Sequence, residues 1–158
     1  MIRLIALALL TLAAPLAARD SLGVYDGWAA FRDARPLRCY AIAKAQGTAP
    51  APAYATISHW PERKVRGAVH VVLSREVAAQ GSVRMAVGTA RFTLVAKGRN
   101  AWAASPREDA AIVAALRSAA RMSVSARSAK GCTFTDRYAL EGVATAMDAA
   151  TVGCAGKR

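Results

Sequence analysis

The fold is decided by residues 83–103, VRMAVGTARFTLVAKGRNAWA. Apolar and polar residues alternate over 83–87 and again over 91–97, which is the period of a strand with one buried face. Gly88-Thr89 and Gly98-Arg99-Asn100 separate these runs and are typical of tight turns. This stretch therefore predicts three short antiparallel strands in succession.

Similar short runs lie on both sides of this stretch. They cover residues 27–32, 37–44, 54–60, 68–74, 122–128 and 132–138. Because each strand must bury one face, about nine such strands predict a mainly β domain, either a β-sandwich or a partly open barrel with helical inserts.

One helix has a clear start in the sequence. Ser105 stands at the N-cap, Pro106 at the first helical position and Glu108 at the third, which together form a capping box. An apolar stripe follows at helical spacing, and Arg121 lies where a helix C-terminus favours a cation. We expect this helix to reach Arg121 and a second, shorter one to cover about 141–151.

The N-terminal segment has the pattern of a secretory signal. Arg3 precedes an apolar run over 4–12, and the small residues that follow predict cleavage after Ala18. The run is too short for a membrane anchor before Arg19 interrupts it. We expect residues 1–18 to be removed and residues 19–158 to form one domain, without a transmembrane segment, in the periplasm or outside the cell.

Three cysteines, Cys39, Cys132 and Cys154, remain after this cleavage. An exported protein meets oxidising conditions, and an odd number allows one internal disulfide and leaves one thiol. Sequence alone permits three pairings. We favour Cys39 with Cys154, which ties an early strand to the end of the chain, and expect Cys132 to be a small buried residue.

The chain is strongly basic, with a formal charge of +12, in which Arg outnumbers Lys by 17 to 5. Such a charge favours an acidic partner, and an acidic envelope polymer is one candidate. Nucleic acid is disfavoured, because an exported protein rarely meets it and the sequence does not interleave aromatic with basic residues. One continuous basic face on the folded domain would indicate a ligand, whereas an even scatter of charge would reflect composition alone.

No residue pattern specifies a reaction. The chain lacks the motifs G-x-S-x-G, G-x-x-x-x-G-K-[ST] and G-x-G-x-x-G, and neither His59 nor His70 has further ligands at metal-binding spacing. We therefore expect no catalytic residues, cofactor or metal. A periplasmic enzyme or enzyme inhibitor is the alternative, and a deep pocket in which Asp136, Arg137 and a His converge would favour an enzyme.

The chain from Gly27 onward resembles the invasion-associated locus B family of exported bacterial proteins. The resemblance rests on the strand from Trp28 to Cys39, on FTLVAKGRNAW at 92–102 and on the segment 131–138. It implies an immunoglobulin-like β-sandwich in the cell envelope and brings no catalytic residues with it. The resulting hypothesis is a non-enzymatic envelope protein that binds another macromolecule, of the envelope or of a host.

Overall fold

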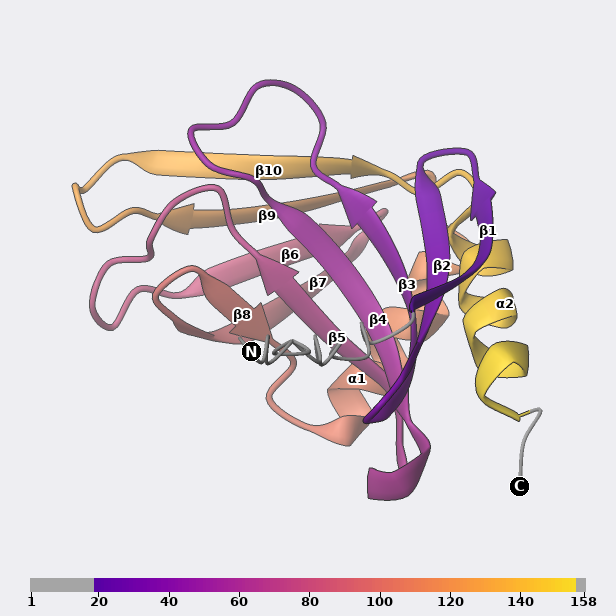
Figure 1. The fold of residues 1–158 in the computed structure, drawn as a ribbon. Coiled ribbons are helices and arrows are strands. Elements are labelled where there is room, and N and C mark those ends of the chain that lie inside the picture. Colours follow the sequence, from indigo (N-terminus) through magenta and orange to yellow (C-terminus); the bar gives the residue numbers. More distant parts are fainter. Residues whose placement is uncertain (1–18, 156–158) are drawn as a thin grey trace, which may run out of the picture.

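The computed structural model describes residues 19–155 as one mainly β domain (Figure 1). Its elements are β1 (Arg19–Tyr25), β2 (Trp28–Ala34), β3 (Leu37–Lys44), β4 (Tyr54–Trp60), a 3-10 turn (Pro61–Arg63), β5 (Val65–Val72), β6 (Val83–Val87), β7 (Ala90–Lys97), β8 (Asn100–Trp102), α1 (Pro106–Leu116), β9 (Arg121–Arg127), β10 (Thr133–Ala139) and α2 (Val143–Ala155). The ten strands form one antiparallel sheet in the order β1-β2-β3-β4-β5-β8-β7-β6-β9-β10. The predicted mainly β class is confirmed.

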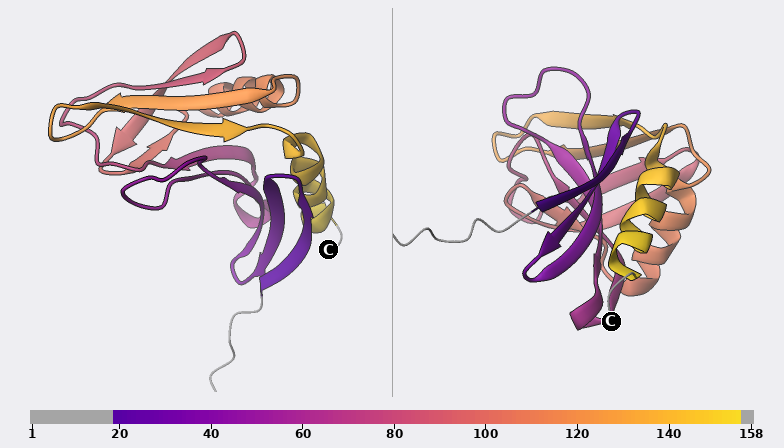
Figure 2. Two further views of the ribbon diagram at one scale, coloured as in Figure 1. Left: turned by 90° about the horizontal axis from the view of Figure 1, so that it is seen from above. Right: turned by 45° about the vertical axis from the view of Figure 1, so that its right-hand side comes forward.

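The sheet bends so that its two ends form two layers, which the left view of Figure 2 shows one above the other. One layer contains β1–β5 and the other contains β6, β7, β9 and β10, with β8 between them. The layers meet at one end, where Gln46 N–H donates to the Arg137 carbonyl at 2.8 Å and Trp28 Nε1 donates to the Ala139 carbonyl at 2.9 Å. The arrangement is therefore sandwich-like, but both layers belong to one continuous sheet.

The hydrophobic core lies between the layers. Trp28, Val71, Val83 and Val124 are all fully shielded from solvent, and residues from both helices complete the cluster. This burial follows the predicted alternation, since every second residue of β6 and β9 points inward. The opposite side chains of the same strands therefore face outward.

Several elements differ from the sequence-based expectation by a few residues; β5, for example, covers Val65–Val72 instead of 68–74, and α2 covers Val143–Ala155 instead of about 141–151. Two differences are larger. β1 was not predicted, because RDSLGVY is largely polar; it is an edge strand that pairs with β2 through an irregular register between Ser21 and Gly23. The first helix ends at Leu116, and Arg121 begins β9 instead. Met122 and Val124 are buried only if the chain leaves the helix and joins the sheet, so core burial overrides the helical pattern.

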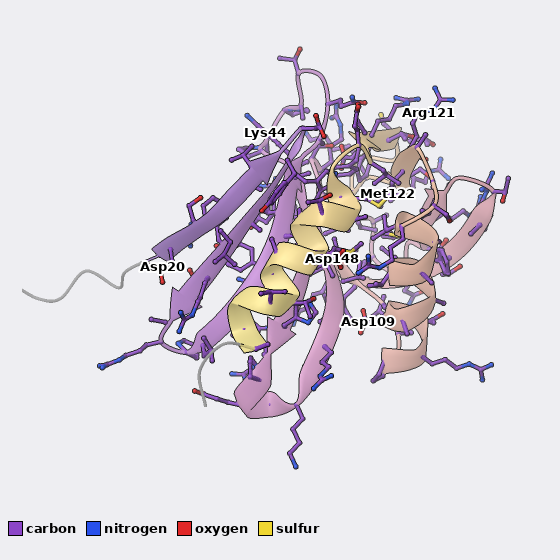
Figure 3. All side chains as sticks on the ribbon, turned by 90° about the vertical axis from the view of Figure 1, so that its right-hand side faces the viewer. Asp20, Lys44, Asp109, Arg121, Met122 and Asp148 are labelled. Carbon is purple, nitrogen blue, oxygen red and sulfur yellow. A yellow bond between two sulfur atoms is a disulfide. The ribbon has the colours of Figure 1, made fainter. Side chains whose placement is uncertain are left out.

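The two helices cover the inner side of the sheet near β1–β5 and stand side by side in Figure 3. Asp109 of α1 accepts the backbone N–H of Val69 at 2.8 Å, and Arg117, directly after α1, donates to Asp148 of α2 at 2.6 Å. Gly142 precedes α2 with φ +80°, and a Cβ at this position would overlap the carbonyl oxygen of Tyr25. The entry into α2 thus requires glycine.

A disulfide joins Cys39 of β3 to Cys154 of α2, with a Cα–Cα distance of 5.7 Å, which is the pairing favoured from sequence. The expectation for Cys132 was wrong, because its side chain is exposed. Cys132 lies in the turn before β10, where no layer covers it. None of the helices in residues 19–155 is long and apolar enough to cross a bilayer. The predicted signal and its cleavage after Ala18 lie outside the described residues.

Candidate functional site

The outward side chains of β6, β9 and β10, together with Arg91 of β7, form a continuous basic surface, which we call the basic face. Its arginines are exposed, and small residues, most of them carrying hydroxyls, lie between them. The arginines are Arg84, Arg91, Arg121, Arg127 and Arg137, and the residues between them are Ala86, Ser123, Ser125, Thr133 and Thr135. No Asp or Glu occupies an outward position on these four strands, all of which lie in the described part of the chain. The positive charge of the layer therefore meets solvent without a negative charge in its own array.

Strand pairing explains how these residues gather. Ser123 of β9 is paired with Arg137 of β10 on one side and with Ala86 of β6 on the other, and Ala86 is paired with Arg91 of β7. Cross-strand partners point to the same side of a sheet, so Ala86 and Arg137 share one surface although they are 51 positions apart in the chain. Figure 3 shows Arg121 at the outer margin and the next residue, Met122, deeper in the molecule.

The arginines of the basic face are free to meet a ligand. Within residues 19–155 the two ion pairs are Arg19–Asp33 and Arg117–Asp148, and both lie elsewhere. Arg91 donates to two carbonyls of its own turn, and Arg127 donates to the Gly131 carbonyl at 2.8 Å. The remaining three arginines of the face make no side-chain hydrogen bond in the described structure. Exposed guanidinium groups of this kind can bind carboxylates or phosphates through two parallel hydrogen bonds.

The basic face is hollowed at two adjacent places. One hollow of about 550 Å³ is lined by residues that include Arg91, Arg121 and Arg137. The second, of about 300 Å³, is lined by residues that include Arg84 and Arg127. Both hollows are also lined by a hydroxyl side chain of β9. The arginines therefore lie around depressions in the surface and not on a flat surface.

Asp136 and Arg137 do not converge. Asp136 points into the core, where it is 4% exposed and accepts the backbone N–H of Ser74 at 2.9 Å, whereas Arg137 points outward from the same strand. The buried Tyr138 hydroxyl has no partner, and burial, together with the nearby Asp136, raises its pKa. The converging set that would have favoured an enzyme is therefore not formed by these residues.

A second group of basic residues lies on the outer side of β1–β4 and forms an arginine–aromatic stack. The guanidinium of Arg38 lies 4.1 Å from the ring centre of Tyr40 and 5.0 Å from that of Trp60. Arg38 also donates to Ser58 Oγ at 2.9 Å, and burial lowers its pKa. Arg19, above the Tyr40 ring, is paired with Asp33. The cations of this stack are engaged by rings, a hydroxyl and a carboxylate, which suits a stabilising role.

The histidines lie apart from the basic face. His59 Nε2 contacts Thr151 Oγ1 at 3.2 Å, beside the disulfide, and His70 Nε2 contacts Asn100 Oδ1 at 3.0 Å. Among the residues that the structure places, no three His, Cys, Asp or Glu side chains come together as metal ligands. Neither histidine is thus part of a metal-binding group in residues 19–155.

The alternation that builds the basic face could be predicted from the sequence, but the face itself could not. The pattern of β9, with Ser123, Ser125 and Arg127 outward, was readable directly from the chain. The strand neighbours β6 and β10 were not, because the order β7-β6-β9-β10 depends on pairing between distant segments. The basic residues therefore looked scattered along the chain although four strands gather five of them.

These features define a class of protein: a mainly β domain that carries one disulfide and one basic sheet face without acidic residues. Comparison of the chain with models of known families, with curated proteins and with solved structures finds no match.

Proposed function

We propose that this protein is an exported, non-enzymatic binding protein of the bacterial cell envelope, and that it holds an acidic macromolecule on its basic face. The observation that carries the proposal is the continuous array of five exposed arginines without an acidic residue among them. The chain has 22 Lys and Arg and ten Asp and Glu, so its average composition corresponds to about two acidic residues for every five basic ones, whereas the basic face has none.

Export is the second part of the proposal. The leader pattern over 1–18 and the resemblance to the invasion-associated locus B family support a periplasmic or secreted location. The Cys39–Cys154 disulfide is consistent with it, because such bonds persist in oxidising compartments. Fractionation and mass spectrometry of the purified protein should find a chain that begins at Arg19; an uncleaved, reduced chain in the cytosol would contradict this part.

The binding role is tested by salt dependence and by matched charge removal. The double variant Arg84→Gln/Arg137→Gln removes two charges from the basic face. The control Arg107→Gln/Arg75→Gln removes two exposed charges from α1 and a loop. We expect the face variant to bind a soluble polyuronate roughly tenfold more weakly than wild type and the control to bind nearly as well, since each exposed pair contributes about 1 kcal/mol or less.

Binding should also weaken steeply between about 0.05 M and 1 M salt. The screening length falls to a few ångströms at the higher concentration, so exposed charges further apart than this interact only weakly. Affinity that survives 1 M salt, or an equal loss in the two double variants, would show that the basic face is not the binding surface.

A further inference from the structure

The arginines of the basic face follow the diagonals of the sheet. Arg91 of β7 is paired with Ala86 of β6, and Arg84 lies two residues from Ala86 on the same outer side. Arg84 is paired with Ser125 of β9, and Arg127 lies two residues further along β9. Each step crosses one strand and advances two residues, so neighbouring arginines on this diagonal are roughly 8 Å apart at their Cα atoms.

A second diagonal runs parallel to the first. Arg121 lies two residues before Ser123 on the outer side of β9, and Ser123 is paired with Arg137 of β10. The step from Arg121 to Arg137 therefore has the same direction, and strand spacing places the two rows of arginines roughly 12 Å apart. Between the rows lie only small side chains, those of Ala86, Ser123, Ser125, Thr133 and Thr135.

The two rows and the small residues between them form a trough. The two hollows of the basic face lie along it, because Ala86 and Ser123 line the larger one whereas Ser125 and Thr133 line the smaller one. The four hydroxyls of the floor make no side-chain hydrogen bond in the described structure. A Ser or Thr hydroxyl both donates and accepts, so the floor can pair with another hydroxyl-rich surface.

We propose that the ligand of this trough is a single linear acidic polysaccharide, which lies across β6, β9 and β10 with its carboxylates on the arginine rows and its sugar hydroxyls on the floor. This inference rests on the proposed function and names the ligand class. Guanidinium groups supply donors for carboxylates on both sides, and the floor supplies both donors and acceptors for sugar hydroxyls.

The composition of the trough separates this ligand from other polyanions. Single-stranded nucleic acid is bound by aromatic side chains on which the bases stack, and no aromatic residue is among the outward residues of the rows or the floor. Membrane-surface binding uses apolar side chains that enter the headgroup layer, and the rows and floor contain none larger than Ala86. The polysaccharide therefore fits the trough best.

A charge-neutral block of the floor tests the inference. Ser125→Tyr fills the middle of the trough without changing charge, and Tyr suits an outward strand position. Thr93→Tyr is the matched control, because Thr93 is paired with Arg84 on the same outer side but lies beyond the arginine row. We expect Ser125→Tyr to weaken binding of a long oligogalacturonate at least tenfold and Thr93→Tyr to change it less than twofold.

The probes are long and short oligogalacturonates, the methyl-esterified long chain, a single-stranded oligonucleotide and anionic phosphatidylglycerol vesicles. The long acidic chain should bind tightest, and the neutral ester should bind at least tenfold more weakly. Tighter binding of the oligonucleotide or the vesicles would overturn the inference. If the two Tyr variants have equal effects while Arg84→Gln/Arg137→Gln still weakens binding, the proposed trough is wrong and the proposed binding role of the basic face stands. If the double variant binds as wild type does, both proposals are wrong.

Discussion

At the scale of single residues, His59 shows how its neighbours set a protonation state. Thr151 Oγ1 donates to the Met147 carbonyl at 2.8 Å and also contacts His59 Nε2 at 3.2 Å. Burial lowers the pKa of His59, and the positive charge of Arg66 lowers it further, so the neutral ring is favoured in the folded protein.

The lowered pKa of His59 predicts a pH-dependent stability. Below the ordinary His pKa of 6.5 the unfolded chain binds a proton that the folded chain resists, so this part of the stability is present above 6.5 and is lost as the pH falls below it. Urea unfolding at about pH 7.5 and pH 5 should show a larger loss for wild type than for His59→Gln. Equal losses would contradict this assignment; the raised pKa of Asp109 acts in the opposite sense at more acidic pH and is common to both proteins.

At the scale of elements, α1 is held by contacts at its first turn. Ser105 Oγ accepts the backbone N–H of Glu108 at 3.2 Å, and Glu108 Oε2 accepts the N–H of Ala104 at 2.9 Å. The next residue, Asp109, accepts the N–H of Val69 from β5. The predicted N-cap is thus confirmed, and the same turn also ties the helix to the sheet at a part of β5 beyond its pairing with β8.

Removing this cap should destabilise the domain measurably. Ser105→Ala leaves the Glu108 N–H without its side-chain acceptor, and we expect a loss of about 1 kcal/mol in the free energy of unfolding. Ser118→Ala is the control, because Ser118 is exposed after the helix end and should change stability by less than about 0.5 kcal/mol. Equal effects in chemical denaturation would show that the cap does not stabilise α1.

At the scale of the whole molecule, the proposed binding surface and the stabilising contacts lie on different parts of the sheet. The disulfide joins β3 to α2 across 115 residues, on the inner side of the layer that contains β1–β5. The arginine–aromatic stack covers the outer side of that layer. The basic face lies on β6, β7, β9 and β10, and neither the disulfide nor the arginine–aromatic stack is on these strands.

This separation predicts that stability can be lowered without loss of binding. Cys39→Ala/Cys154→Ala should lower the free energy of unfolding by about 2–5 kcal/mol, as for other disulfides that close long loops. Cys132→Ala should have little effect, since its thiol is exposed and unpaired. At a temperature below the midpoint of its thermal unfolding, the double variant should bind polyuronate as wild type does. A loss of affinity at that temperature would show that the disulfide shapes the basic face.

Much of the secondary structure could be predicted because its signals are local. The bounds of β3, β4 and β6 agree with the alternation of their residues, and the cap at Ser105 marks the start of α1. The end of α1 and the presence of β1 could not be predicted. Arg121 leaves the helical pattern because the residues after it are buried in the sheet, and β1 is a polar strand that exists through its pairing with β2.

The candidate site divides in the same way. By itself, the sequence determined which residues of each strand face outward, because alternation is a property of one strand, and it favoured the Cys39–Cys154 pairing. Only the tertiary structure decided that β7, β6, β9 and β10 are neighbours and in which register they pair. Core burial across distant segments sets that register, and the register places the arginines in two rows.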